Sequence, residues 1–599
     1  NIFRFIEEKA IPPMQAAVMA TKDIGLAVMA TTLSLVVVFL PVSFMSSISG
    51  RFLYSFGFTA SVAILVSLVV SFSLTPMMSS RMLRRQDVTS HGGSRRGFYV
   101  HVDRIYMRLL AAAMRHRAVV AGFALLVMAS GIPLYKLVRH EYIPTNVDES
   151  EFEMSVTAPE GTSLTAMQDA MDRLSGELRN LPGIEHVLTI IGTGYLQQVN
   201  SGRAYVKLAP IEDRVFSISR LAKKTLEGHP WEAFRGVYSQ RDVMQAVRGR
   251  VRRYPDLRVS VRNSVSVNQG SAPVDLDLAL RGPDLMELHR YSEHLRTVAA
   301  QTPGIVDVDT TLRLTKPELR VFIDRGRAAD LGVDASDIAG SLRIMVGGDD
   351  EVSRFRDERA AEEYDVEVRL VGKDRDSAAT VSKLWVPSAK SGLTRLDNVV
   401  NMRESMSAFR IERLDRQRVV GIRANISAGY ALADRLDEMY KAVGAMNLPA
   451  AYTTMVVGRG REFERTLGEF LLAFLLSITF MYMVLASQFE SLTHPVTILL
   501  SLPLAVPFGF LSLWLFRDTL NLYSALGILV LFGVVKKNSI LQVDHTNNLR
   551  RAGMERMQAI LQANRDRLRP ILMTTLTLVA GMLPLALGAG PGAEERRSI

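Results

Sequence analysis

The most conspicuous pattern along the chain is a set of long apolar runs separated by polar segments. A helix needs about 20 apolar residues to cross a bilayer. Seven runs approach or exceed that length, near residues 24–45, 53–76, 118–138, 470–487, 495–516, 521–543 and 570–588. Buried helices of a water-soluble core are rarely so long or so numerous, so the pattern predicts seven membrane-spanning helices.

Arginines between these runs predict how the chain crosses the membrane. Residues 84–117 and 544–569 are arginine-rich, whereas the short connections near 46–52 and 517–520 carry one arginine each. By the positive-inside rule the two arginine-rich loops are cytoplasmic. Counting crossings from there places residues 139–466 and 589–599 outside the cytoplasm.

The large outer segment predicts strands alternating with amphipathic helices. In "EFEMSVTAP" apolar residues alternate at Phe152, Met154, Val156 and Ala158, which is typical of a half-buried strand. A helical pattern follows, with apolar residues on one face at Leu164, Met167, Met171, Leu174 and Leu178, and it ends at "LPGIEHV". The same order recurs 121 residues later: "VDLDLAL", a helix with Leu285, Leu288, Leu295 and Val298, then "TPGIVDV". This predicts duplicated βαβ units packed on sheets.

A second repeat lies in the apolar runs. "TTLSLVVVFLP" (Thr31–Pro41) matches "TTLTLVAGMLP" (Thr574–Pro584) with its threonines, leucines and proline in register. Repeated bundles with an ion site at their interface are common in transporters. At this offset, the counterpart of Lys537 would lie just upstream of Asn1.

Composition agrees with a membrane protein that carries a polar domain. Apolar residues make up 48% of the 599 residues and charged ones 22%. The net charge of +10 could indicate nucleic acid, but the basic residues gather beside apolar runs, which favours membrane topology. The chain has no cysteine, which excludes disulfides and cysteine-based metal or redox sites.

No enzymatic motif stands out. The sequence has no glycine-rich phosphate loop, no His/Glu pair at metal-binding spacing and no nucleophile elbow. We therefore expect no cofactor and no metal site. If the chain transports, its energy comes from an ion gradient or from another subunit.

Two adjacent lysines, Lys536 and Lys537, interrupt the run 521–543. A lysine in a spanning helix costs a few kcal/mol unless it pairs or reaches the surface. Neighbouring helical residues point about 100° apart, so both lysines cannot face one partner. Lys536 is interpreted as reaching the cytoplasmic interface. Lys537 lies about 9 Å from the cytoplasmic end of the run. Its side chain either reaches that interface as well or faces a buried partner, and we favour the buried partner.

No complementary carboxylate occupies the middle of any of the seven runs. Asp544 lies two turns from Lys537 on its own helix and is interpreted as interfacial. Thr574 and Thr575 fall one turn inside the last run, where a threonine usually bonds its own helix backbone but could relay a proton beside a buried lysine. Arg567 and Arg569 are by default cytoplasmic anchors.

Several stretches together resemble the resistance–nodulation–division (RND) efflux pumps, in the branch that exports drugs and hydrophobes. "GVVKKNSILQVDH" and "RDRLRPILMTTLTLVAGMLPLALGAGPGA" are similar to the last membrane helices of that family. "RVFIDRGRAADLGVDASDIAGSLRIMVGG" resembles its passage into the docking domain, and "EYIPTNVDESEFEMSVTAPEGTSL" resembles the start of its second porter half. The resemblance covers nearly the whole chain in order.

The resemblance implies an α+β membrane protein with a transmembrane helical bundle. A large periplasmic insertion would contain ferredoxin-like βαβ porter subdomains and a docking subdomain. Membrane helices would occupy 1–138 and 467–599. The porter subdomains would span 139–270 and 271–320 plus 414–466, and the docking subdomain 321–413.

In function, the resemblance implies a homotrimeric, proton-driven antiporter of the bacterial inner membrane. It would export drugs or other amphiphilic small molecules together with a periplasmic adaptor protein and an outer-membrane channel. The proton-relay residues would be Lys537 paired with Asn538, supported by Arg567 and Thr574. Lys536 has no counterpart in that role.

The family's paired aspartates would precede Asn1. The chain is therefore expected to be the C-terminal part of a pump, about 60% of it, without the acidic pair, the first porter half and the final helix. A mid-membrane carboxylate pair is expected seven or eight residues upstream of Asn1.

The sequence leaves more than one class of exported substrate open. The metal-exporting branch uses porter methionines, and Met154 and Met244 are present, but Met154 sits in an apolar alternation typical of a core strand. In the loop Ile190–Leu208, the side chains Tyr195, Gln197 and Gln198 either line a substrate site or belong to a plain hairpin. A non-transporting or secretion-assisting scaffold is a further alternative.

Overall fold

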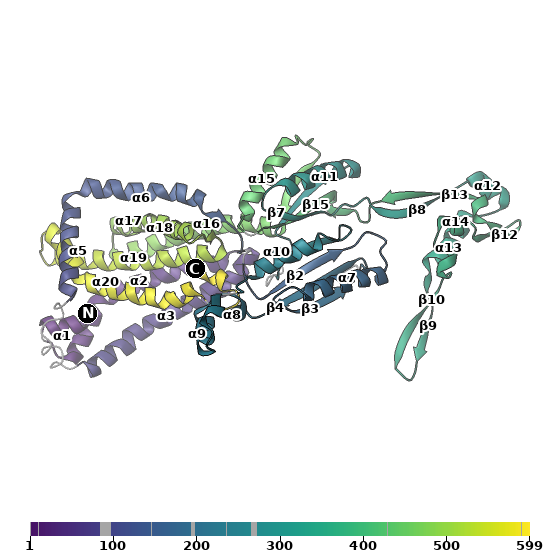
Figure 1. The fold of residues 1–599 in the computed structure, drawn as a ribbon. Coiled ribbons are helices and arrows are strands. Elements are labelled where there is room, and N and C mark those ends of the chain that lie inside the picture. The colour runs from purple at the N-terminus through teal and green to yellow at the C-terminus, as the bar shows by residue number, and fades with distance from the viewer. Residues whose placement is uncertain are drawn as a thin grey trace.

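The computed structural model describes residues 2–9, 11–83, 98–144, 147–192, 198–234, 236–264, 272, 274–427, 429–588 and 590–599. The molecule is elongated, with a helix bundle at one end, two sheets beside it and a slender extension beyond them (Figure 1). Its mixture of membrane helices with extramembrane sheets confirms the predicted fold class.

In the part of the chain that the structure describes, seven helical segments are long and apolar enough to span a membrane, and each coincides with one of the seven predicted runs to within one residue or extends beyond it. Their helices are α2 (Pro13–Phe39, continued by η1, Pro41–Phe44), α3 (Ile48–Met82), α6 (Arg117–Leu137), α16 (Gly458–Phe489), α17 and α18 (Thr493–Leu499 and Ser501–Leu515), α19 (Leu522–Arg551) and α20 (Arg556–Leu587). Most extend beyond the apolar run, because helix formation continues where the chain leaves the bilayer.

Two further helices lie at the end of the bundle away from the sheets, namely α1 (Ile2–Lys9) and α5 (Phe98–Arg115) (Figure 1). Helix α5 is tied to α20 by Arg565, whose Nη2 lies 3.0 Å from Asp103 Oδ2. The Arg569 guanidinium lies over the Tyr99 ring.

The first sheet has the strand order β3-β4-β2-β5, with all neighbours antiparallel. Its strands are β2 (Glu151–Thr157), β3 (Ile184–Ile191), β4 (Ser201–Leu208) and β5 (Arg258–Asn263), and its helices are α7 (Leu164–Arg179) and α10 (Gln240–Val251). Strands β2 and β3 are parallel with β4 between them, so β2–α7–β3 is a split βαβ unit.

The second sheet repeats this arrangement. Strands β6 (Leu276–Gly282) and β7 (Ile305–Thr310) flank β15 (Gln417–Ile426), and α11 (Leu285–Gln301) connects them. Strand β14 (Glu412–Leu414) pairs with β15, β16 (Thr453–Val457) pairs with β6, and α15 (Leu432–Ala445) corresponds to α10. The predicted duplication of βαβ units is thus visible in the topology.

The turns before β3 in the first sheet and before β7 in the second sheet also correspond. Gly183 precedes β3 with φ +87°, and Gly304 precedes β7 with φ +88°. Each glycine carbonyl accepts a hydrogen bond from the residue that follows the central strand, Ala209 in one sheet and Ser427 in the other. An aromatic ring, Tyr238 or Tyr430, covers each glycine.

Between β7 and β14 the chain leaves the second sheet. The antiparallel pair β8 (Lys316–Ile323) and β13 (Val400–Ser407) leads to a small distal cluster made of α12 (Arg325–Leu331), α13 (Ala335–Leu342), η3 (Arg343–Gly347), η4 (Gly372–Asp374), α14 (Ala378–Val381), β11 (Trp385–Ser388), β12 (Gly392–Arg395) and η5 (Leu396–Asn398). A solvent-exposed hairpin projects from it, formed by β9 (Asp349–Asp357) and β10 (Glu362–Val368).

Sheets and helices meet at a compact junction. The short parallel pair β1 (Arg139–His140) and β17 (Thr519–Leu520) joins the segment after α6 to the segment before α19. Helix α21 (Ala593–Arg597) lies beside it, and α8 (Ile211–Arg214), α9 (Ile218–Leu226) and η2 (Pro230–Phe234) follow β4. The domain boundaries given above remain predictions.

Candidate functional site

Lys536 lies in the buried stripe of α19 that faces α2. The stripe includes Leu529, Gly533 and Ile540 at spacings of three and four residues, and Lys536 has no exposed surface. Its Nζ donates a hydrogen bond to the main-chain oxygen of Ser34 in α2. The prediction that Lys536 reaches the cytoplasmic interface is therefore wrong.

Close approach of the two helices makes this bond possible. Gly533 lies one turn before Lys536, and a Cβ there would come within 2.4 Å of the Leu35 side chain. The absence of a side chain lets α19 approach α2, so that a lysine can reach a carbonyl of the opposite helix.

Lys537 and Asn538 are half-buried, and no hydrogen bond or ion pair joins either of them to Arg567 or Thr574 within the described residues. Lys537 is the sixteenth residue of α19, which continues for about 21 Å beyond it to Arg551. The helix end is thus farther away than the apolar run indicated. Asp544, seven residues on, shares a helix face with Lys537.

Arg567 is buried on α20, and it interacts electrostatically with Asp544 of α19 and with Arg4 and Asp23 near the N-terminus. Its Nε has no hydrogen-bond partner among the described residues. A charged cluster therefore gathers where α1, α2, α19 and α20 meet.

Beside Arg567, His545 Nε2 and Asp566 Oδ2 lie 3.2 Å apart, linking α19 to α20. Asp566 also accepts a hydrogen bond from Gln562 at 3.0 Å. Residue spacing alone did not single out His545.

Thr574 is exposed on α20, and its hydroxyl donates to the Ile571 carbonyl at 3.0 Å. This is the ordinary back-bond of a threonine in a helix. Its role as a relay residue is untested.

Of the residues predicted for substrate contact, Tyr195 and Gln197 lie outside the described residues. Gln198 is half-buried, and its carbonyl accepts from the Ser201 N–H at 3.0 Å in the turn before β4. Their role stays a prediction.

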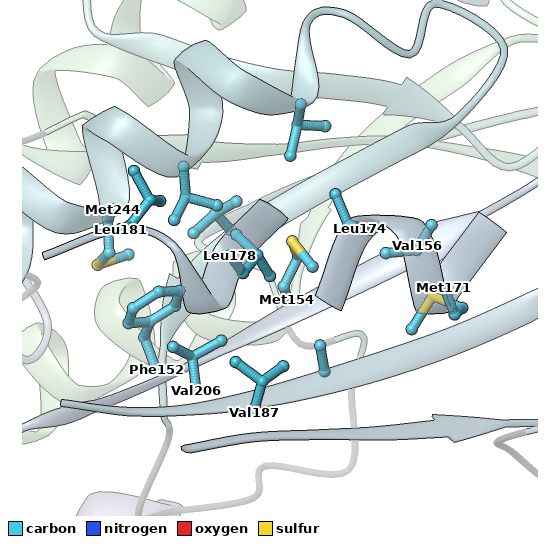
Figure 2. Close-up of a cluster of buried hydrophobic side chains, with 14 of the residues drawn as sticks. Phe152, Met154, Val156, Met171, Leu174, Leu178, Leu181, Val187, Val206 and Met244 are labelled. Atoms are coloured by element: carbon cyan, nitrogen blue, oxygen red, sulfur yellow. The ribbon is translucent and has the colours of Figure 1, made fainter. Parts of the chain in front are cut away.

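Met154 and Met244 belong to the apolar core of the first sheet. Met154 is fully buried and Met244 nearly so, among Phe152, Leu178 and other hydrocarbon side chains (Figure 2). The interpretation of Met154 as a core residue is confirmed. Methionine fills irregular apolar space of this kind well.

A hydrogen-bonded junction links the N-terminal end of α19 to the first sheet. The Leu522 N–H donates to the Tyr142 carbonyl at 3.2 Å, and the Tyr142 hydroxyl lies 2.7 Å from Ser49 Oγ of α3. Ser49 Oγ lies 3.0 Å from Thr466 Oγ1 of α16. Three membrane helices therefore meet the segment that enters the sheet.

Asp148 and Arg214 complete the junction. The fully buried Arg214 pairs with Asp148 through its two terminal guanidinium nitrogens, Nη1 and Nη2, and the Gln240 N–H donates to Asp148 at 3.0 Å. Burial alone would raise the pKa of Asp148, but these bonds outweigh it and hold the pKa below its ordinary value. Nothing in the sequence pointed to this pair, because its members are distant in sequence and form no motif.

Comparison with known proteins decides the family. The model of the AcrB/AcrD/AcrF family matches residues 1–599. The chain belongs to this family. As an RND permease it is an inner-membrane protein with several apolar helices and a large extramembrane region.

Solved structures show the same fold. Two crystal forms of a heavy metal efflux pump superpose on this RND permease chain with TM-scores of 0.79 and 0.78, at 22% and 20% sequence identity. Each match covers 98% of this chain, but only 57% and 55% of the pump. The chain thus spans a little more than half the length of these structures.

Proposed function

We propose that this RND permease chain is part of an inner-membrane pump subunit that exports drugs or other amphiphilic small molecules, driven by protons. The observation that carries the proposal is the charged cluster within the helix bundle, where the buried Arg567 of α20 interacts electrostatically with Asp544, on the face of α19 that carries Lys537. Charged groups buried among membrane helices are costly, and they typically mark ion or proton pathways.

In the proposed relay, Lys537 and Asn538 take part in proton transfer, supported by Arg567 and Thr574. Lys537 shares a face of α19 with Asp544, which interacts electrostatically with Arg567. Protonation of an opposing carboxylate would weaken its attraction for Lys537 and change the position of α19.

Movement of α19 would reach the porter sheets through the junction. Its first residue bonds Tyr142, and the adjoining Asp148–Arg214 pair supports the first sheet. Alternating access would then follow from relative movement of the two sheets.

Two substrate classes are candidates, amphiphilic small molecules and heavy-metal cations. The amphiphile reading is supported by Met154 and Met244, whose side chains are packed among hydrocarbon groups and so are poorly disposed to bind a cation. A heavy-metal cation is the second candidate, because both matched structures are described as a heavy metal efflux pump.

We further propose that the working assembly is a homotrimer with a periplasmic adaptor and an outer-membrane channel. Tyr195, Gln197 and Gln198 would contact substrate at the β3–β4 turn. In the second sheet, the equivalent connection, between β7 and β15, contains the whole distal extension. We therefore propose that insertions at this edge of a sheet can carry a function.

The test is an export assay in cells that lack their own pumps, using the full-length protein and an amphiphilic fluorescent dye. We expect dye export that stops when the proton gradient is dissipated, and no added tolerance to heavy metals. Metal tolerance that is lost in Met154→Leu would favour the metal exporter. Function that persists without a proton gradient would favour a scaffold.

A further inference from the structure

The connection between β4 and α10 is much longer than its counterpart in the second sheet. In the first sheet 31 residues (209–239) separate the central strand from the helix, whereas in the second sheet five (427–431) suffice. The extra residues form α8, α9 and η2, which we call the foot. The sheet itself does not need it, since the second sheet closes the same fold without one.

Contacts place the foot at the boundary between the helix bundle and the first sheet. Arg214 of α8 pairs with Asp148, and the Asp148 carbonyl accepts a hydrogen bond from the Gly592 N–H at 3.0 Å. Gly592 lies five residues after the last residue of α20, Leu587. Figure 1 shows α9 at the boundary between the helix bundle and the sheets.

Large apolar side chains cover the surface of the foot. Leu226 is 90% exposed, Trp231 78% and Phe234 57%. Phe216 joins them, with its ring stacked on that of Phe234 at a centroid distance of 4.9 Å. The Trp231 ring adjoins Phe234 as well, at a centroid distance of 6.5 Å, and a group of neighbouring exposed rings is unusual on a surface that faces only water.

The two lysines of the foot pair with carboxylates of the foot itself. Lys224 pairs with Glu227 at 2.8 Å and with Glu232 at 3.3 Å, and Lys223 pairs with Asp213 at 3.5 Å. An apolar, aromatic surface with paired charges suits the boundary between lipid headgroups and acyl chains, where tryptophan is enriched.

We propose that the foot inserts Leu226, Trp231 and Phe234 into the outer leaflet of the bilayer and so anchors the first sheet to the lipid surface. Because its lysines are paired within the foot, binding depends on apolar contact and does not require anionic lipid. The anchor would keep the foot end of the first sheet at the membrane surface while the two sheets move relative to each other.

The chain has three tryptophans, Trp231, Trp385 and Trp514, which allows a direct test. Trp385→Phe combined with Trp514→Phe leaves Trp231 as the reporter. The protein is placed in phosphatidylcholine nanodiscs with and without bromine on the acyl chains. We expect brominated lipid to quench Trp231 emission about twofold, because bromine quenches only on close approach.

The matched control is the variant Trp231→Phe/Trp514→Phe, which reports from Trp385. That residue is 56% exposed on the distal cluster, so brominated lipid should leave it unchanged, whereas aqueous acrylamide should quench it. Trp231 emission quenched by acrylamide but not by brominated lipid would overturn the proposal. So would emission protected from both, since that indicates a protein partner or a second copy over the foot.

Discussion

At the scale of single residues, the two sheets share a glycine that no other residue can replace without strain. Gly183 and Gly304 both have a positive φ and both lie beneath a tyrosine ring. A Cβ on Gly183 would lie 2.3 Å from the Tyr238 hydroxyl oxygen, and one on Gly304 2.2 Å from the Tyr430 ring. Backbone conformation and ring packing therefore impose the same residue twice.

We expect Gly183→Ala and Gly304→Ala each to destabilise their sheet by about 1–3 kcal/mol. Thermal unfolding of the purified protein measures this. Gly176→Ala is the control: a Cβ on Gly176 in α7 would meet no atom of the described residues outside its own helix within 4 Å, and there alanine should be neutral or stabilise by up to about 1 kcal/mol. Equal effects at all three sites would contradict the argument.

The Asp148–Arg214 pair should make the first sheet sensitive to acid. The folded pKa of Asp148 lies below its ordinary value, so its stabilising contribution is present above the unfolded pKa of about 3.9 and disappears as pH falls through the folded pKa. Asp148→Ala leaves a buried guanidinium unpaired and should cost about 3–5 kcal/mol at neutral pH.

Measuring the free energy of unfolding as a function of pH tests this. The difference in that free energy between the wild type and Asp148→Ala should shrink as pH falls below about 4. Asp213→Ala removes only the exposed partner of Lys223 and should change stability by about 0.5 kcal/mol or less. A pH-independent difference for Asp148→Ala would show that the ion pair is not its cause.

Lys536 illustrates what residue-level prediction can miss. Its neighbours Leu529, Gly533 and Ile540 share its helix face, and following that spacing through the lysine would have placed it in the buried stripe. The free-energy cost of burying a lysine in the membrane led instead to the prediction that Lys536 reaches the cytoplasmic interface. The hydrogen bond to Ser34 could not be foreseen, because α2 is about 500 residues away in sequence.

At the scale of elements, alternation and helical spacing were reliable where one face is buried. Strand β2 and helices α7 and α11 appear where the apolar pattern predicted them. Helix ends were less predictable: α19 continues to Arg551 and α2 begins at Pro13, since polar residues outside the bilayer still form helix.

The contact between α2 and α19 should depend on the small residue at Gly533. Gly533→Leu would drive a side chain into Leu35, separate the helices and lower stability by about 1–3 kcal/mol. Denaturation of the detergent-purified protein measures the effect. Gly468→Leu on α16 should be tolerated, because a Cβ at Gly468 would meet no atom of the described residues outside its own helix within 4 Å. Similar losses for both would mean that close packing at Gly533 is unimportant.

At the scale of the whole molecule, the apolar runs and the repeat predicted the architecture, because both reflect burial over long segments. The junction and the foot were not predicted. They depend on contacts between segments hundreds of residues apart, or on an insertion with no periodic pattern of its own.

The arrangement also predicts sidedness. The chain has no cysteine, so single cysteines can be introduced at will. A cysteine at Phe355 on the distal hairpin should react with a membrane-impermeant maleimide added from the periplasmic side. One at Glu555, between α19 and α20, should react only after the membrane is opened. The reverse pattern of labelling would show that the chain crosses the membrane in the opposite orientation.

The central claim is that Lys537, and not its buried neighbour Lys536, takes part in proton coupling. The direct measurement is substrate-driven proton flux through the full-length protein in liposomes, for Lys537→Met and Lys536→Met side by side. The account predicts that Lys537→Met lowers the flux at least about tenfold, whereas Lys536→Met retains coupling. Normal flux in Lys537→Met together with loss in a folded Lys536→Met would contradict it.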